Sequence, residues 1–260
     1  TDVMEVLKPI WSEKTETASR LRGRIEAVLT WAAVHGYRKG DNPARWKGNL
    51  DVVLPKPGKI KNETHRPAVS LKDAPAWFVE LRARKGFATR ALEFVALTAS
   101  RSAEVRGMTW REVDLEDGVW IVPADRMKMS REHRVALSSA AIDLLECLDR
   151  MSDSPFVFPA ARGGALSDMA LSACMKRIHE AQDGDGFLDA KSGHRAVPHG
   201  LRSTFRDWAA EKTEYPRDMA ELALAHDIGS AVEQAYRRSD MLEKRRRMME
   251  DWAEFLQGVR

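Results

Sequence analysis

The chain has 260 residues, more than one average domain needs, and its formal net charge is +3. Its two cysteines lack the paired spacing of a disulfide framework or a zinc site, so we expect no bound metal. No apolar run approaches the roughly 20 residues that cross a membrane, and the N-terminal residues are polar, which predicts a cytoplasmic protein without a membrane partner.

One long amphipathic helix is predicted at the front of the chain, over residues 14–36, where apolar residues recur at helical spacing up to a glycine stop. Residues 48–67 collect proline, glycine, lysine and asparagine without periodicity, which is typical of a linker. We therefore expect two domains, 1–62 and 63–260. Because one helix cannot bury its own apolar face, the first domain is interpreted as part of a larger helical domain.

The second domain is predicted to be mainly α with a small antiparallel β-sheet, an α+β fold. Ser70 and Asp73 form a capping-box pattern that opens a helix, and the apolar stretch ATRALEFVALTAS predicts another. Alternating residues between 111 and 138, with the turn pair Asp117-Gly118, predict the sheet. Further helices are expected at about 139–151, 168–182, 200–213, 216–225 and 240–257.

Basic residues gather in clusters such as RARKGFATR, DRMKMSREHR and EKRRRMM. Clustered cations favour a polyanionic partner, although a solvated helix face is the simpler interpretation of any single cluster. His199 and Arg202 in HGLRSTFRDW lie three residues apart on one helix face, a spacing at which both side chains reach one phosphate. A surface pair is an equally good interpretation of that motif alone.

Two further cations belong to motifs that are weak by themselves. Arg101 follows the apolar helix, with Glu104 one turn further on, so it could cap that helix, pair with Glu104 or face a cleft. Lys128 lies between two methionines in the turn joining two predicted strands, a position at which most lysines are simply solvated.

The placement of Tyr236 is poorly explained by packing. It is one of three tyrosines, and the sequence around it, AHDIGSAVEQAYRRSD, supplies a histidine and two arginines. By contrast, Tyr37 lies in an exposed-looking loop of the front domain, and Tyr215 precedes Pro216 at the start of a predicted helix. By itself, Tyr236 also fits a tyrosine between helices whose hydroxyl donates to a backbone carbonyl.

Together, in this order, these stretches resemble the tyrosine recombinases, the phage-type integrases, over about residues 70–257. The family's pattern is an arginine in T-x-x-R-x-x-E, a lysine in a β-turn, an H-x-x-R pair, a histidine or tryptophan, and the tyrosine. Every position is matched here, by Thr98, Arg101, Glu104, Lys128, His199, Arg202, His226 and Tyr236. The segments AYRRSDMLEKRRRMMEDWAEFL and KTETASRLRGRIEAVLTWA look like those of P4-like prophage and genomic-island integrases.

The resemblance implies that the chain cleaves and rejoins duplex DNA at attachment sites through a 3′-phosphotyrosine link, without metal or cofactor. It implies that the catalytic residues are Arg101, Lys128, His199, Arg202, His226 and Tyr236, with Glu104 in support. It also implies that residues 1–62 are part of a DNA-binding core-binding domain. The expected assembly is a homotetramer on DNA from a monomer in solution, aided by accessory DNA-bending proteins.

Two other functions stay open at this point: a DNA-binding or architectural protein of the same fold without the chemistry, and a type IB topoisomerase-like enzyme. The predicted helix 240–257 has two interpretations as well. It packs on its own domain, or it docks onto a neighbouring protomer, as the corresponding segment does in the resembled family.

Overall fold

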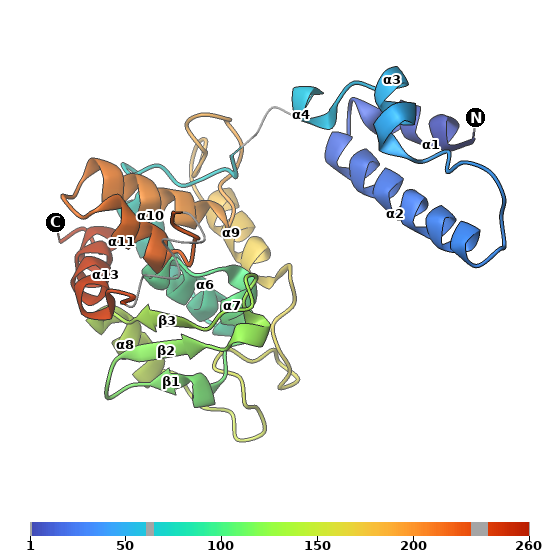
Figure 1. The fold of residues 1–260 in the computed structure, drawn as a ribbon. Coiled ribbons are helices and arrows are strands. Elements are labelled where there is room, and N and C mark those ends of the chain that lie inside the picture. Colours follow the sequence, from blue (N-terminus) through green and yellow to red (C-terminus); the bar gives the residue numbers. More distant parts are fainter. Residues whose placement is uncertain (1, 61–64, 230–238, 260) are drawn as a thin grey trace. The chain divides into compact units, whose positions relative to one another are not determined.

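A computed structural model describes residues 2–60, 65–229 and 239–259. The chain forms two compact units, Thr1–Thr64 and His65–Arg260, each with its own hydrophobic core (Figure 1). No helix in the described ranges is both long enough and apolar enough to cross a bilayer.

The first unit is built on two packed helices, α1 (Asp2–Trp11) and α2 (Thr15–Val34). Helix α2 covers the predicted long helix. The expectation of a single helix was wrong, because α1 buries Leu7 and Trp11 completely and supplies the partner for α2. Pro9 lies inside α1, and in a sequence a proline normally indicates the end of a helix or a kink.

Most of the predicted linker also belongs to this first unit. An irregular helical turn (Trp46–Leu50) leads into the short helices α3 (Asp51–Val53) and α4 (Pro57–Ile60). Leu50 and Leu54 are buried in the same cluster as Trp11, whose indole N–H donates to the Pro55 carbonyl at 2.9 Å. These two leucines, at i and i+4, anchor in the core of the first unit a stretch whose composition is that of a linker.

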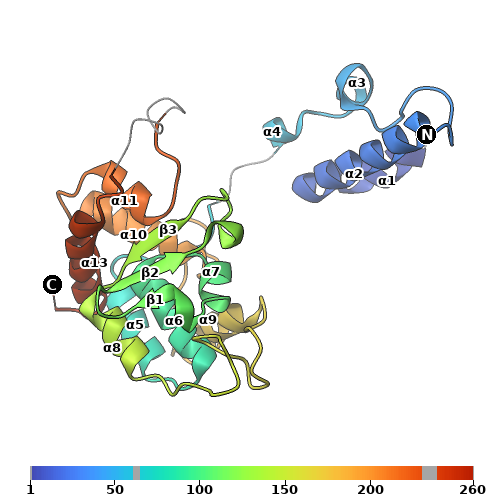
Figure 2. The same ribbon diagram turned by 60° about the horizontal axis from the view of Figure 1, so that its bottom comes forward.

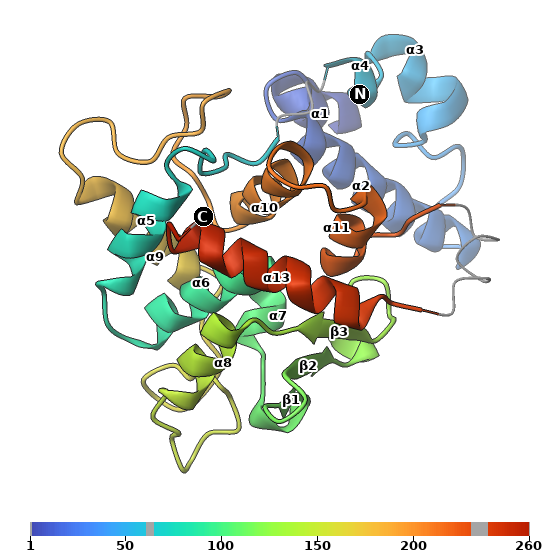
Figure 3. The same cartoon turned by 90° about the vertical axis from the view of Figure 1, so that its left-hand side faces the viewer.

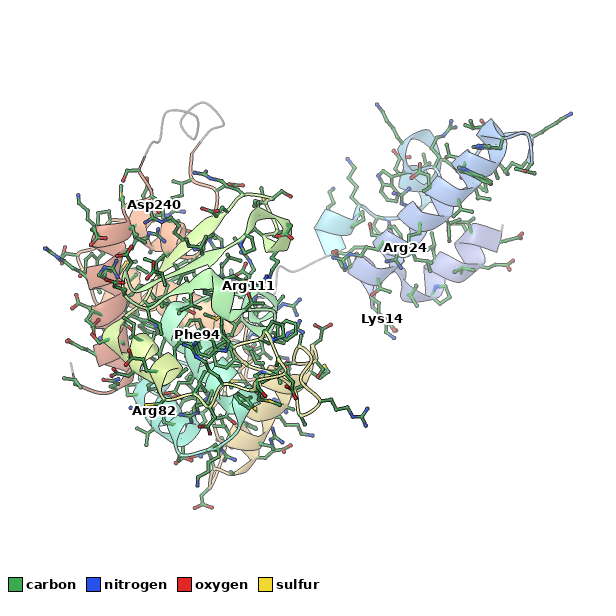
Figure 4. All side chains as sticks on the ribbon, turned by 90° about the horizontal axis from the view of Figure 1, so that it is seen from below. Lys14, Arg24, Arg82, Phe94, Arg111 and Asp240 are labelled. Carbon is green, nitrogen blue, oxygen red and sulfur yellow. The ribbon has the colours of Figure 1, made fainter. Side chains whose placement is uncertain are left out.

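The second unit is arranged around the buried helix α6 (Phe87–Thr98), which contacts six other helices of the described part of the unit. Phe94 lies in the interior, with its ring centroid 5.6 Å from the rings of both Trp120 and Phe158 (Figure 4). The remaining helices are α5 (Ala74–Arg82), α7 (Ser102–Arg106), α8 (Ser139–Glu146), α9 (Ala170–Glu180), α10 (Gly200–Glu211), α11 (Arg217–Ala223) and α13 (Leu242–Leu256).

A three-stranded antiparallel sheet covers one side of this unit, in the order β1 (Val113–Asp114), β2 (Val119–Val122), β3 (His133–Ala136) (Figure 2). Trp120 pairs with Val113 on one side and with Val135 on the other. Gly118 has φ +58° in the β1–β2 turn, a conformation that favours glycine. The predicted α+β fold is therefore confirmed.

Helix α13 packs against its own unit, on α5, α6, α8, α11 and β3 (Figure 3). Trp252 is 1% exposed, and its indole N–H donates to the Ala96 carbonyl at 2.8 Å. Arg245, part of the basic cluster EKRRRMM, is buried and donates to the carbonyls of Asp240 and Arg134 at 2.8 Å. Packing in cis, the simpler of the two interpretations, is what the structure shows for α13.

Candidate active site

Arg101 is held rigidly at the start of α7. Helix α6 ends in Ala99, whose left-handed φ of 50° turns the chain sharply. The Arg101 guanidinium pairs with the buried carboxylate of Glu104 at 2.7 Å, and the same carboxylate accepts the Arg101 backbone N–H at 2.9 Å. Its second terminal nitrogen points to the Ala225 carbonyl at 3.4 Å. Glu104 thus fixes both the main chain and the side chain of Arg101.

Arg202 lies in the first turn of α10 and is only 5% exposed. Its Nη1 donates to the Ala99 carbonyl and its Nη2 to the Leu224 carbonyl, both at 2.6 Å. Nη2 also lies 3.0 Å from Nε2 of His226. Since Ala99 is two residues before Arg101 and Leu224 precedes Ala225, the two guanidinium groups converge on one place from distant parts of the chain.

The partners of Arg202 are neutral. Within the described ranges, no carboxylate forms an ion pair with its guanidinium, whereas Arg101 has Glu104. Burial, and next the positive charge of Arg101, lower the pKa of Arg202 to about 10. A buried cation without an anionic partner is costly, so this arrangement suits an anion that arrives from outside the chain.

His226 is oriented by Glu221 of α11. The Glu221 carboxylate lies 2.7 Å from Nδ1 of His226 and also accepts the Nε–H of Arg206 at 2.7 Å. Burial acts to raise the pKa of Glu221, but these hydrogen bonds outweigh it and leave that pKa lowered. Because arginine can only donate, Nε2 of His226 is the acceptor from Arg202, and Nδ1 carries the proton given to Glu221.

His199 lies at the N-terminus of α10, next to the same cluster of charges. Partial desolvation of its ring, followed by the positive charges of Arg202, Arg66 and Arg101, lowers the pKa of His199. Gly200 allows a close approach here, since a Cβ on it would lie 1.9 Å from the Pro67 carbonyl oxygen. The glycine is required by packing against the segment that precedes α5.

Lys128 is exposed in the β2–β3 turn, which is closed by the Ser130 N–H donating to the Met127 carbonyl at 3.0 Å. Its neighbours Met127 and Met129 line a cavity of about 410 Å³ that His226 also lines. The structure therefore brings the lysine turn to the edge of the region in which the arginines and histidines meet. Tyr236 lies outside the described residues.

His133, at the start of β3, was missed as a candidate by the sequence analysis. It lines the same cavity and hydrogen-bonds the Ala223 backbone. Burial, and next the charge of Arg245, lower its pKa to about 4, with smaller contributions from Arg202 and Arg101. In the sequence, the only signal is a histidine at the first position of the predicted strand HRVAL, which lies in the basic cluster DRMKMSREHR.

Comparison with known protein families identifies the chain. The model of the phage integrase family matches residues 80–243, and that of the phage integrase central domain matches residues 1–49. The chain belongs to the phage integrase family. The stretch of this phage integrase that matches the family contains all seven predicted site residues.

Three integrases are similar to this protein over almost the whole chain. Prophage integrases IntA and IntZ of Escherichia coli are 34% and 31% identical over 94% and 99% of it, covering 55% and 60% of their own lengths. The integrase of enterobacteria phage P4 is 28% identical over 94% of the chain and 56% of its own length. The chain thus spans little more than half the length of these relatives, and the similarity places it with integrases of prophage and P4 type.

Solved structures with the same fold are also integrases. A lambda integrase dimer bound to a COC′ core site has a TM-score of 0.60 at 16% identity, over 87% of this chain and 78% of its own. The Tn1549 transposon integrase in complex with circular intermediate DNA has a TM-score of 0.56 at 15% identity, over 91% and 84%. At these identities the likeness establishes the fold.

Proposed function

We propose that this phage integrase is the cleaving and rejoining part of a site-specific DNA recombinase that integrates or excises a prophage or genomic island. The oxygen of Tyr236 attacks a DNA phosphodiester, so a tyrosine O–P bond forms and the P–O5′ bond breaks. The products are a 3′-phosphotyrosine link and a free 5′-hydroxyl, and the reverse reaction rejoins the strand.

The convergence of Arg202 and Arg101 carries this proposal. Arg202 is buried with neutral partners and Arg101 reaches the neighbouring carbonyl, which makes a positively charged site for one phosphate. The five-coordinate transition state has more negative charge on its nonbridging oxygens than the ground state. Two fixed guanidiniums stabilise that extra charge without reorganising during the reaction.

We assign the roles of the other residues by analogy with the resembled family. Lys128 protonates the 5′-oxygen as it leaves, from its exposed position in the β2–β3 turn. His199 assists proton transfer at the tyrosine, and its lowered pKa keeps the ring neutral and able to accept a proton. His226 hydrogen-bonds the phosphate, with its ring oriented by Glu221.

We further propose that the partner is duplex DNA at attachment sites, in the bacterial cytoplasm, and that no metal or cofactor takes part. The lambda integrase structures include a dimer on a core site and a tetramer on a Holliday junction. By analogy, this chain would act as a homotetramer on DNA, assembled from monomers with the help of DNA-bending proteins.

The test is a suicide substrate nicked just downstream of the scissile phosphate. After cleavage the short fragment that carries the free 5′-hydroxyl diffuses away, so the strand cannot be rejoined and the covalent complex accumulates. We expect a DNA-linked species on a denaturing gel that Tyr236→Phe abolishes and Tyr215→Phe preserves. The Tyr215 hydroxyl donates to Asp251 at 2.6 Å, so this matched control removes a hydroxyl with a purely structural partner.

The alternatives predict different outcomes. A DNA-binding protein without the chemistry would retard the substrate but form no covalent species. A type IB topoisomerase-like enzyme would form it on DNA of any sequence and relax supercoils as a monomer. Dependence on one attachment sequence is expected for the recombinase.

A further inference from the structure

The guanidinium of Arg126 connects three elements of the second unit. Arg126 ends the short helical turn η3 (Ala124–Arg126), which follows β2. Its Nη1 forms an ion pair with the Glu112 carboxylate, and its Nη2 donates to the main-chain carbonyl of Glu104 in α7. Glu112 lies in the helical turn η2 (Trp110–Glu112) before β1. We name this set, Arg126 with Glu112 and the Glu104 carbonyl, the Arg126 clamp.

The clamp is anchored on the side of Glu112. The carboxylate of Glu112 also accepts the indole N–H of the fully buried Trp120 at 2.9 Å and the hydroxyl of Thr109 at 3.0 Å. The side chains of Arg126 and Glu112 are 22% and 12% exposed, so the ion pair is largely shielded from solvent. Shielded, charge-assisted hydrogen bonds of this kind are stronger than exposed surface pairs.

The two ends of the clamp lie at two predicted catalytic residues. Glu104, whose carbonyl Arg126 holds, fixes the guanidinium and backbone N–H of Arg101 with its own carboxylate. On the other side, Lys128 is only two residues after Arg126, in the turn that begins with the buried Met127. Lys128 itself is exposed, so the geometry of its turn decides where its ammonium group can reach.

We propose that Arg126 is a positioning residue, which holds the β2–β3 turn against α7 so that Lys128 and Arg101 act on the same phosphate. The planar fork of an arginine suits this task, because it sends two donors to a carboxylate and to a carbonyl at once. A lysine offers all its protons from one nitrogen. The proposal rests on the function proposed above, in which Lys128 protonates the leaving 5′-oxygen.

The local packing gives an independent way to disturb the clamp. A Cβ at Gly107 would lie 3.1 Å from Nη2 and 3.3 Å from Nε of Arg126, so the guanidinium lies directly on this glycine. The substitution Gly107→Ala therefore pushes the guanidinium away without removing any charge. Arg111→Ala is the matched control, because Arg111 is exposed on η2 beside Glu112 and its loss removes the same charge (Figure 4).

The experiment compares single-turnover cleavage of two suicide substrates, one with the natural 5′-oxygen and one with sulfur at the bridging 5′ position. A thiol has a pKa of about 8.5, so it leaves as a thiolate without a proton from the enzyme, whereas the alcohol needs one. Arg126→Ala is expected to slow cleavage of the natural substrate by tenfold or more. Gly107→Ala displaces the guanidinium only slightly and should slow cleavage less. Sulfur should restore most of that loss, as it should for Lys128→Ala but not for Arg101→Ala.

Each other outcome overturns the proposal. Cleavage by Arg126→Ala within threefold of wild type means that the clamp does not position Lys128. An equal loss on both substrates, with weaker DNA binding, means that Arg126 contacts DNA directly. A third outcome is that Arg126→Ala loses the same cleavage rate on both substrates and has a lowered melting temperature, while Arg126→Lys and Gly107→Ala cleave like wild type. That result means that Arg126 only stabilises the fold. If wild type forms no covalent complex on either substrate, the proposed function itself fails.

Discussion

Replacing Arg202 separates its structural role from its chemical role. In Arg202→Ala the carbonyls of Ala99 and Leu224 lose their donors, at 2.6 Å each. A buried acceptor left unpaired costs about 1–3 kcal/mol, so the two together cost about 2–6 kcal/mol. The variant also loses the desolvation cost of the buried guanidinium, and water can enter the space that it leaves. Both effects bring the loss of unfolding free energy toward the lower figure.

We expect Arg202→Ala to reduce the cleavage rate more severely than it reduces the fraction of folded protein. Removing one preorganised donor from a developing oxyanion costs about 10²–10³ in rate. Arg202→Lys keeps a positive charge, but one ammonium cannot reach both carbonyls and a phosphate as the fork does. We therefore expect the lysine variant to regain part of the stability and little of the cleavage rate.

The assay measures both quantities on the same preparations. Urea unfolding gives the free energy of unfolding, and single-turnover formation of the covalent complex at saturating protein gives the cleavage rate, at a temperature where both variants are fully folded. DNA affinity should change much less than the rate. If Arg202→Ala cleaved within tenfold of wild type while its unfolding free energy fell, Arg202 would be a structural residue and the proposed site would be wrong.

The remaining predictions concern the surroundings of the site. The His133 pKa of about 4 lies below its ordinary value of 6.5, so between these pH values the unfolded chain binds a proton that the folded one does not. The free energy of unfolding should therefore fall by up to about 3 kcal/mol as the pH drops from 6.5 to 4. Urea unfolding at pH 7 and pH 5 measures this loss, which should be smaller in His133→Gln than in wild type. If the two proteins lost the same free energy of unfolding between these pH values, His133 would not be buried as a neutral imidazole. Gly200→Ala should lower the melting temperature strongly, because the added methyl group meets the Pro67 carbonyl. Gly164→Ala is the control and should leave the melting temperature unchanged, because no atom lies within 4 Å of a Cβ at that position. Equal melting temperatures of the two variants would refute the close approach at Gly200. Trp252→Ala should cost about 3–5 kcal/mol of unfolding free energy through the cavity and the unpaired Ala96 carbonyl, and a loss below 1 kcal/mol in urea unfolding would show that α13 is not part of the core.

Local sequence was sufficient for most of the second unit. Apolar spacing located α6, α8, α9, α10, α11 and α13, and the alternation around Asp117-Gly118 located the sheet, because these features depend on residues close together in the chain. The same approach failed for α1 and for residues 48–60. There, a few buried side chains such as Trp11 and Leu50 decided the structure against the composition.

The sequence by itself determined the order and type of the candidate residues, Arg101, Lys128, His199, Arg202, His226 and Tyr236, and through them the family. Only the tertiary structure decided which groups hydrogen-bond the side chains of these residues and fix them in place. Arg202 reaches a carbonyl 103 residues away and Arg101 one that is 124 residues away. Such contacts cannot be read from a sequence, because every residue carries the same carbonyl and only packing decides which one faces a given guanidinium. The Arg126 clamp also depends on a main-chain carbonyl, that of Glu104, and was hidden for the same reason.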